Sequence, residues 1–320
     1  MNYADALIRE LKEPVKKEQD LRETDLLTIL KTPRGIEQTE KAGIKILVED
    51  VQQKFNSLEH MKVDSRFVKD VANKIVDSVY QRDENQIEYV KNMAKVREIN
   101  PQPLLDNHCF FCPNPTYMET LFADLGVYKK DLHISTSENT LWKDRFIIPI
   151  RDFKGDVYGF VGYNKFSNAK YVEWSSPTYK LATIKALGLD HVSNILEKKY
   201  CIFTEGSFDY FRGHLHGFPV VANLGIQFNK LLKMLIDRLD IVFTAYDSDE
   251  TGIKNMDSID GLHPYVYHIQ FKPTIDREGK SVKSDMDEAL KDLKRVELLS
   301  EEIEKRLKFK NVKLPKRILV

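Results

Sequence analysis

The strongest constraint on the fold is a regular alternation of apolar runs and amphipathic segments that begins near residue 200 of this 320-residue chain. Short apolar runs predict strands, and stretches with helical spacing predict helices. The strands are expected at 200–204, 219–222, 241–246 and 265–269, and the helices at 207–216, 228–239, 251–259 and from 286 onward. Alternation at this spacing predicts parallel strands in a doubly wound α/β unit.

Acidic residues follow three of the predicted strands. Glu205 directly follows the first strand, Asp247 and Asp249 directly follow the third, and Asp285 follows the last strand after a loop. Ligands of such sheets bind at the carboxyl ends of the strands, so these side chains are expected to converge on one rim. Hard oxygen ligands crowded together favour Mg²⁺ or Mn²⁺, which also bind phosphate oxygens.

The residues beside these acids suit a ligand site. A side chain at Gly206 would obstruct the turn and the close approach of a ligand. Thr251 and Gly252 open the next helix, whose N-terminus would favour a phosphate. The alternative interpretation of 247–249 is a turn with a helix cap. Three acid-bearing strand ends in one α/β unit favour the metal site over this alternative.

The rest of the chain has a different texture. Residues 1–100 hold only two of the 14 glycines and show apolar residues at helical spacing, which predicts a helical accessory region. A proline-bearing stretch that begins near residue 100 indicates a junction. The apolar runs at 146–150 and 157–161, separated by a turn at 152–156, predict a β-hairpin.

Two motifs in the α/β unit resemble the Toprim signature. They read Thr204-Glu-Gly-Ser-Phe-Asp209 and, about forty residues later, Tyr246-Asp-Ser-Asp-Glu-Thr-Gly252. Toprim domains occur in bacterial-type (DnaG-like) primases, topoisomerases and certain nucleases. The resemblance implies a metal site built from Glu205, Asp247 and Asp249, with Asp209 as a supporting acid.

A third segment is similar to the Lys-Asp-Pro-Asp-Glu motif of the primases. It reads Lys283-Ser-Asp-Met-Asp-Glu288, so the proline is missing and Ser284 is inserted. The similarity implies that Asp285 is a further metal ligand.

The block that precedes the Toprim-like unit resembles the bacterial primases specifically. Arg145-Phe-Ile-Ile-Pro-Ile-Arg-Asp152, Gly159-Phe-Val-Gly162, Lys170-Tyr-Val-Glu-Trp-Ser-Ser-Pro177 and Lys185-Ala-Leu-Gly-Leu189 follow the order of their motifs. In that family the block forms a basic groove for template and incoming nucleotide. The resemblance places Arg145, Arg151, Lys170 and either Lys180 or Lys185 on its basic positions, whereas Tyr163 replaces a family arginine.

These resemblances imply an α/β protein in which a Toprim doubly wound parallel sheet follows a mixed α/β primase subdomain and a helical N-terminal region. The expected parts are a helical accessory region (1–100), a nucleic-acid-binding subdomain (101–195), a Toprim catalytic domain (196–284), and a C-terminal helix with a basic tail (285–320). The last 16 residues hold seven basic residues and no acid, which would suit DNA, an acidic partner surface or a frayed end.

The implied activity is that of a DNA-directed RNA primase, a nucleotidyltransferase that makes short RNA primers on single-stranded DNA for replication. It would use ribonucleoside triphosphates and Mg²⁺ or Mn²⁺. The chain has no Gly-x-x-x-x-Gly-Lys-Ser/Thr sequence, so a separate replicative helicase is expected. The alternatives are a Toprim nuclease, or a non-polymerising replication accessory protein.

Composition and cysteine spacing narrow the remaining choices. Formal net charge is zero, so any nucleic-acid surface must be a local patch. His108-Cys109-Phe-Phe-Cys112 resembles only half of the primase zinc ribbon, and a structural zinc needs four ligands, so zinc is not expected. Three cysteines and the lack of a membrane-length apolar stretch predict a cytoplasmic protein without a membrane partner. The resemblance to bacterial-type primases implies a bacterial cell, or one infected by a phage, as the setting.

Overall fold

The computed structural model describes residues 65–320 except for short gaps at 115, 126–141, 153, 175–185, 225–229, 248–251, 253–255, 257, 276–280, 283, 311 and 313. Several predictions fall on the segments left out. They concern residues 1–64 of the helical region, most of the helix expected at 251–259, and the side chains of Asp249, Lys180 and Lys185.

The predicted hairpin is confirmed and belongs to a four-stranded antiparallel sheet. Its strands follow one another in space as β1 (Phe110–Cys112), β2 (Arg145–Arg151), β3 (Val157–Tyr163) and β4 (Tyr171–Trp174). The β2–β3 turn forms because the Asp152 carboxylate accepts the backbone N–H groups of Lys154 (2.8 Å) and Asp156 (3.1 Å). Gly155 in this turn has a φ of 84°, a conformation that glycine adopts without strain.

Helices α4 (Ser65–Arg82) and α5 (Asn85–Val96) pack on β3 and β1 of this sheet, followed by α6 (Gln102–Asp106) and α7 (Tyr117–Ala123). Ile75 and Val79 of α4 share a hydrophobic cluster with Phe110 and Phe160 of the sheet. The described part of the helical region therefore shares a core with the sheet that follows it. Apolar residues at helical spacing predict a helix, but they do not say which surface covers it.

The second sheet has six strands in the spatial order β12-β9-β8-β6-β7-β5. Strands β6 (Tyr200–Thr204), β7 (Val220–Asn223), β8 (Ile241–Thr244) and β9 (Val266–Gln270) are parallel, as the alternation predicts. A fifth parallel strand, β12 (Arg317–Leu319), pairs with β9 and was not predicted. Only the two-residue β5 (Ala186–Leu187) is antiparallel, pairing with β7. The chain leaves β6 toward one edge of the sheet and leaves β8 toward the other.

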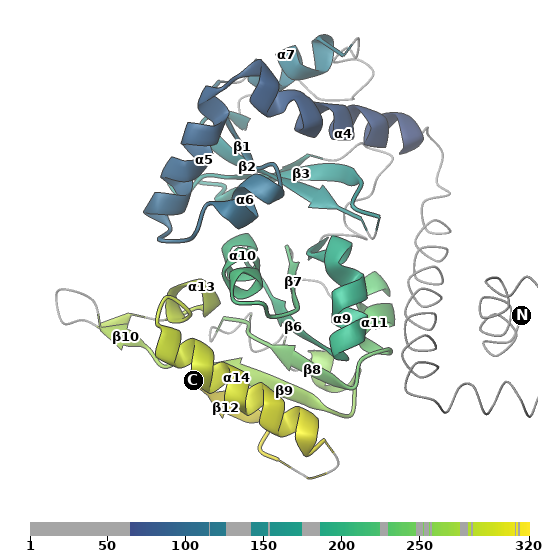
Figure 1. The fold of residues 1–320 in the computed structure, drawn as a ribbon, viewed down its shortest axis with the longest axis vertical. Coiled ribbons are helices and arrows are strands. Elements are labelled where there is room, and N and C mark those ends of the chain that lie inside the picture. The colour runs from purple at the N-terminus through teal and green to yellow at the C-terminus, as the bar shows by residue number, and fades with distance from the viewer. Residues whose placement is uncertain are drawn as a thin grey trace, which may run out of the picture.

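Helices connect and flank these strands. They are η3 (Leu189–His191), α9 (Val192–Lys198), α10 (Ser207–Leu215), α11 (Lys230–Ile236), α13 (Met286–Ala289) and α14 (Leu293–Lys308), and a short hairpin of β10 (Thr274–Ile275) and β11 (Ser281–Val282) precedes α13. Helix α10 lies between the two sheets (Figure 1). There its Phe208 ring stacks on Phe146 of β2 with centroids 6.3 Å apart, so one continuous core joins both sheets.

The C-terminal region differs from expectation in two ways. The single long helix predicted from residue 286 is wrong: the chain forms α13 and then α14, because Asp292 adopts an extended backbone and its carboxylate accepts the N–H of Lys294 (3.0 Å). The end of the tail is not frayed. It forms β12, which adds to β9 at the sheet edge and buries Ile318. Within the described residues no helix has the length and apolar character needed to cross a membrane.

Candidate active site between the two sheets

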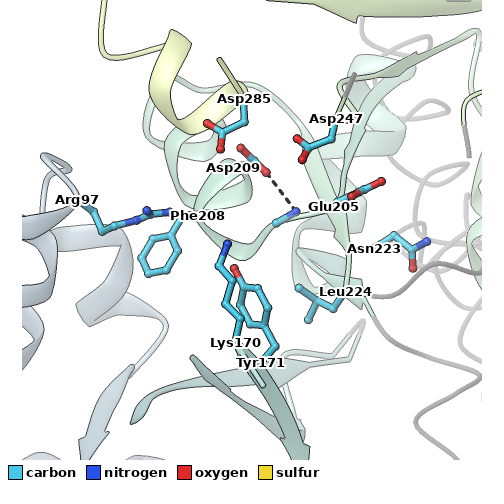
Figure 2. A pocket seen from close by; sticks show the side chains of 11 residues that line it. Arg97, Lys170, Tyr171, Glu205, Phe208, Asp209, Asn223, Leu224, Asp247 and Asp285 are labelled. Carbon is cyan, nitrogen blue, oxygen red and sulfur yellow. Dashed lines mark hydrogen bonds between the residues drawn. The ribbon is translucent and has the colours of Figure 1, made fainter. Parts of the chain in front are cut away.

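A cavity of about 250 Å³ lies where the first sheet meets the carboxyl ends of the parallel strands. Figure 2 shows acids on the side of the second sheet and two basic side chains on the opposite side. The cavity is lined by Arg97, Lys170, Tyr171, Glu205, Gly206, Phe208, Asp209, Asn223, Leu224, Asp247 and Asp285.

The topology of the second sheet places Glu205 and Asp247 in this cavity. Glu205 follows β6 and Asp247 closely follows β8, and these two strands are direct neighbours. The connections that leave β6 and β8 run in opposite directions, so a crevice opens between them, which is where open α/β sheets bind ligands. Gly252 permits the tight bend after Asp247, because a side chain there would overlap the carbonyl oxygen of Asp247.

Asp209 is buried in the first turn of α10 and organises the floor of the cavity. Its carboxylate accepts the backbone N–H groups of Gly206 (3.1 Å) and Asp287 (2.8 Å). Burial, together with the nearby carboxylates of Asp285 and Asp247, raises the pKa of Asp209 well above its usual value. Negative charge is therefore crowded at this point.

The structure shows what a side chain at Gly206 would obstruct in the turn. Its φ of −95° is open to any residue, so the turn itself does not demand glycine. A Cβ atom there would instead lie 2.5 Å from Oδ2 of Asp209. Gly206 thus leaves room for the Asp209 carboxylate to accept the backbone N–H of the β6–α10 turn.

Asp285 and Asp287 have different surroundings, although they are only two positions apart. Asp285 is exposed at the N-cap of α13, where its carboxylate accepts the N–H of Glu288 (2.8 Å). Asp287 is buried and forms ion pairs with Arg97 (3.0 Å) and Arg212 (3.1 Å). Asp285 therefore lines the cavity, while the Asp287 carboxylate is engaged by the two arginines.

Two cations line the opposite side of the cavity. Lys170 is exposed at the start of β4, with its Nζ 5.4 Å from the ring centroid of Tyr171. Arg97, which sequence reasoning missed, follows α5 and lies 4.1 Å from the ring centroid of Phe208. No sequence motif identifies Arg97. It reaches the cavity only because the first sheet and its helices pack on α10.

Tyr163, which stands where the primase motif has an arginine, is buried between these two cations. Its ring centroid is 5.8 Å from the Arg97 guanidinium and 5.9 Å from Lys170 Nζ. It also meets the Phe208 ring edge-on at 5.0 Å. The position therefore contributes an aromatic support beneath the cations rather than a positive charge.

Arg145 and Arg151 do not reach the cavity. Arg145 is 1% exposed, and its guanidinium donates to Gly162 O (3.2 Å), Ser167 Oγ (3.0 Å), Ala169 O (2.9 Å) and Lys170 O (3.3 Å). The predicted direct contact of Arg145 with nucleic acid stays a prediction, and in this structure the guanidinium bonds within the first sheet and the loop before β4. The guanidinium of arginine carries five N–H donors in a rigid planar group, and here it hydrogen-bonds the loop between β3 and β4.

Arg151 also forms hydrogen bonds to residues near its own strand of the first sheet. It donates to Gly155 O (2.8 Å) and Asn107 Oδ1 (3.3 Å).

The donor set of the cavity suits a hard divalent cation. Glu205, Asp247 and Asp285 offer carboxylate oxygens, and crowding around Asp209 would be relieved by positive charge. Among the residues that the structure describes, no three His, Cys, Asp or Glu side chains are grouped closely enough to hold a metal ion. The side chains as placed therefore line a common space without forming a closed coordination sphere.

The residues that resemble half of a zinc ribbon, His108, Cys109 and Cys112, do not line this cavity. Cys109 is buried in the core that joins both sheets, and Cys112 is buried in the cluster beneath α4. The ring of His108 stacks on Tyr80 with centroids 5.8 Å apart. The two thiols thus occupy separate hydrophobic surroundings.

Fold and site together define an α/β protein with an acidic cavity at the switch point of a parallel sheet. No protein-family model and no curated protein matches the chain. Solved structures do match, and they are DnaG-type primase catalytic cores. The zinc-binding and RNA polymerase domains of the Aquifex aeolicus primase match with a TM-score of 0.59 and 24% identity, over 76% of this chain and 62% of that one.

Two further structures agree with this assignment of the fold. The Escherichia coli primase catalytic core matches with a TM-score of 0.53 and 17% identity, over 78% of this chain and 85% of that one. The RNA polymerase domain of Mycobacterium tuberculosis DnaG, in complex with double-stranded DNA with a 6-nucleotide overhang, matches with a TM-score of 0.54 and 20% identity, over 77% and 86%. The chain therefore has the mixed α/β fold of primase catalytic cores, and it spans about three fifths of the Aquifex structure.

Proposed function

We propose that this protein is a DNA-directed RNA primase, with a Toprim-type metal site, that synthesises short RNA primers on single-stranded DNA. The observation that carries the proposal is that three acids line one side of a single cavity, opposite Arg97 and Lys170. Glu205 and Asp247 follow neighbouring strands of the sheet, and Asp285 is the N-cap of α13. Opposed acids and cations suit a reaction in which a triphosphate must be held beside divalent cations. The primase-core fold supports this choice among metal-dependent activities.

Each group would have a defined task. Mg²⁺ or Mn²⁺ would supply activation of a 3′-hydroxyl and neutralisation of the triphosphate. Glu205, Asp247, Asp285 and the adjacent Asp249 would hold the ions, and Asp209 would keep the β6–α10 turn in place for them. Lys170 and Arg97 would bind phosphate oxygens as the strand and nucleotide enter.

The proposal extends to partners and to residues outside the cavity. Lys180 and Lys185 remain proposed contacts of the template or nucleotide, because they belong to the same primase-like block. Single-stranded DNA and ribonucleoside triphosphates are the proposed ligands, and a separate replicative helicase is the proposed partner. The proposed setting is the cytoplasm of a bacterial or phage-infected cell.

A primer-synthesis assay tests the activity. The protein is incubated with single-stranded DNA, labelled ribonucleotides and Mg²⁺ or Mn²⁺, alone and with the cognate helicase. We expect short ribonucleotide products from the wild type and at least a 100-fold loss for Asp247→Asn, because a carboxylate ligand is removed. Asp240→Asn, at a surface ion pair with Lys310, is the matched control and should retain activity. Strand cleavage would instead indicate a nuclease, and neither product would indicate an accessory protein.

Metal binding can be tested without catalysis. A ligand that binds only the folded state stabilises it by about 2.7 kcal/mol at 100 times its dissociation constant. We expect saturating Mg²⁺ or Mn²⁺ to raise the free energy of unfolding of the wild type, and to raise that of Asp247→Asn far less. Equal stabilisation of both proteins would place the bound ion elsewhere.

A further inference from the structure

The loop between β3 and β4 presents a fully exposed aromatic ring. Phe166 is 92% exposed, the largest value among the exposed large hydrophobic side chains of the described residues. The loop is a closed hairpin end, because Asn164 N–H donates to Lys170 O (2.9 Å) and Phe166 N–H donates to Asn164 Oδ1 (2.8 Å). A ring this exposed contributes little to the packing of the residues that the structure describes.

The loop is held from below by the buried guanidinium of Arg145. Three of the acceptors of Arg145 lie in the loop, at Ser167, Ala169 and Lys170. Asn164 adds a further anchor through its Nδ2, which donates to Asp144 O (2.9 Å). The backbone that carries Phe166 is thus preorganised, so little conformational entropy would be lost when the ring binds a ligand.

The positive charge beside the Phe166 ring indicates the kind of ligand that it would bind. Lys165 is exposed beside Phe166, Lys170 lies at the base of the loop and also lines the cavity, and residues 164–171 contain no acid. An aromatic ring flanked by lysines suits single-stranded nucleic acid, in which bases stack and phosphates attract cations. A protein partner would need an apolar patch of several hundred Å² per side, whereas the tip of this loop offers one ring among polar side chains.

We propose that Phe166 stacks on a base of single-stranded nucleic acid, with Lys165 and Lys170 beside the phosphates of the same strand. Because Lys170 is shared with the cavity, a strand held on this loop would be led to the acidic rim. That direction of the strand rests on the proposed function, but the stacking contact does not. We call this part of the β3–β4 loop, with Lys165, Phe166 and Lys170, the stacking loop.

Binding measured without divalent ions tests the stacking contact independently of catalysis. Fluorescently labelled oligo(dT) and a matched abasic oligonucleotide are titrated with the full chain and with Phe166→Ala, Phe166→Leu and Phe166→Trp. Loss of one stacked base should weaken oligo(dT) binding by at least about 5-fold in the alanine and leucine variants. The tryptophan variant should bind like the wild type, and the abasic strand should bind all four proteins equally.

The outcomes separate this inference from the proposed primase activity. Unchanged oligo(dT) affinity of Phe166→Ala overturns the stacking contact, even if the ring proves to contact a protein instead. An equal loss for oligo(dT) and the abasic strand also overturns it, because a stacking contact needs a base. A chain that makes no primers but shows Phe166-dependent binding would refute the activity and leave the inference standing. Phe166 is exposed, so unchanged thermal unfolding of the variants verifies that they are folded.

Discussion

The Nε atom of Arg212 lies 3.1 Å from Oδ1 of Asp287, and both side chains are buried. The other carboxylate oxygen of Asp287 pairs with Arg97 at 3.0 Å. The two remaining guanidinium nitrogens of Arg212 donate to the backbone carbonyls of Arg97 and Glu98, each at 2.8 Å. This cluster connects α10 and α13, which flank the second sheet, to the end of α5. It also holds Arg97 at the cavity.

Loss of the Arg212 side chain should therefore destabilise the protein strongly. Arg212→Met leaves a buried carboxylate with one partner fewer and two carbonyls without their donor. We expect the free energy of unfolding to fall by about 3–5 kcal/mol, as for other broken buried ion pairs. Urea unfolding measures the change, and Lys91→Met on the exposed side of α5 is the control with an expected change near zero. A loss below 1 kcal/mol for Arg212→Met would contradict this role.

Arg145→Lys separates a structural role from a role in binding. A lysine keeps the charge but cannot reach the four acceptors, so we expect a loss of roughly 2–4 kcal/mol in the free energy of unfolding. Arg317→Lys, at an exposed position of β12, should change stability by less than about 0.5 kcal/mol. If Arg145→Lys leaves stability intact but weakens DNA binding, the nucleic-acid contact predicted from the sequence would be supported instead of the structural role.

The carboxyl group of Asp209 should make stability fall with increasing pH. Its pKa in the folded state is raised by burial and by nearby Asp285 and Asp247, so the folded state binds more protons than the unfolded state. The stabilising contribution is fully present below the unfolded pKa of about 3.9 and is lost as pH rises toward the folded pKa. We expect the free energy of unfolding of the wild type, minus that of Asp209→Asn, to decline from about pH 4 upward.

Urea unfolding of both proteins across this range, without divalent ions, gives the difference directly. Titrating groups that do not interact with Asp209 cancel because the two proteins share them. Asp285 and Asp247 do interact with Asp209, so the difference also contains any change that the substitution makes in their titration. A difference that stays level or rises with pH would show that Asp209 is not held in an environment that disfavours its charge.

The three thiols should be inert in the folded protein. All three cysteines are buried, and burial raises the pKa of Cys112 to about 12 and raises the pKa values of Cys109 and Cys201 as well. Because the thiolate is the reactive form, a disulfide reagent at pH 8 should label no thiol in the native state and three in denaturant. Elemental analysis of the same sample should find no stoichiometric zinc. Rapid labelling of a thiol in the native state, or stoichiometric zinc, would contradict the conclusion that these cysteines are buried, unreactive and not metal ligands.

The elements that were predictable arise from interactions between near neighbours in the chain. The apolar run at 200–204 and its following acid identify a strand end at Glu205 without any knowledge of the packing. The turn at 152–156 follows from an aspartate that bonds the next few N–H groups and from a glycine at positive φ. The division of the C-terminal helix escaped prediction because apolar spacing continues through 286–308, and a single side-chain cap at Asp292 decides the break.

The sequence by itself determined the order of the strands, the hairpin and the acids that follow β6 and β8, since apolar periodicity and turn chemistry act over a few positions. Only the tertiary structure decided which cations face those acids. Arg212 reaches a carbonyl 114 positions away, and through that contact Arg97 arrives at the cavity while Arg145 is buried beneath the stacking loop. Such contacts depend on how two sheets pack around α10, and no local pattern in the chain records that packing.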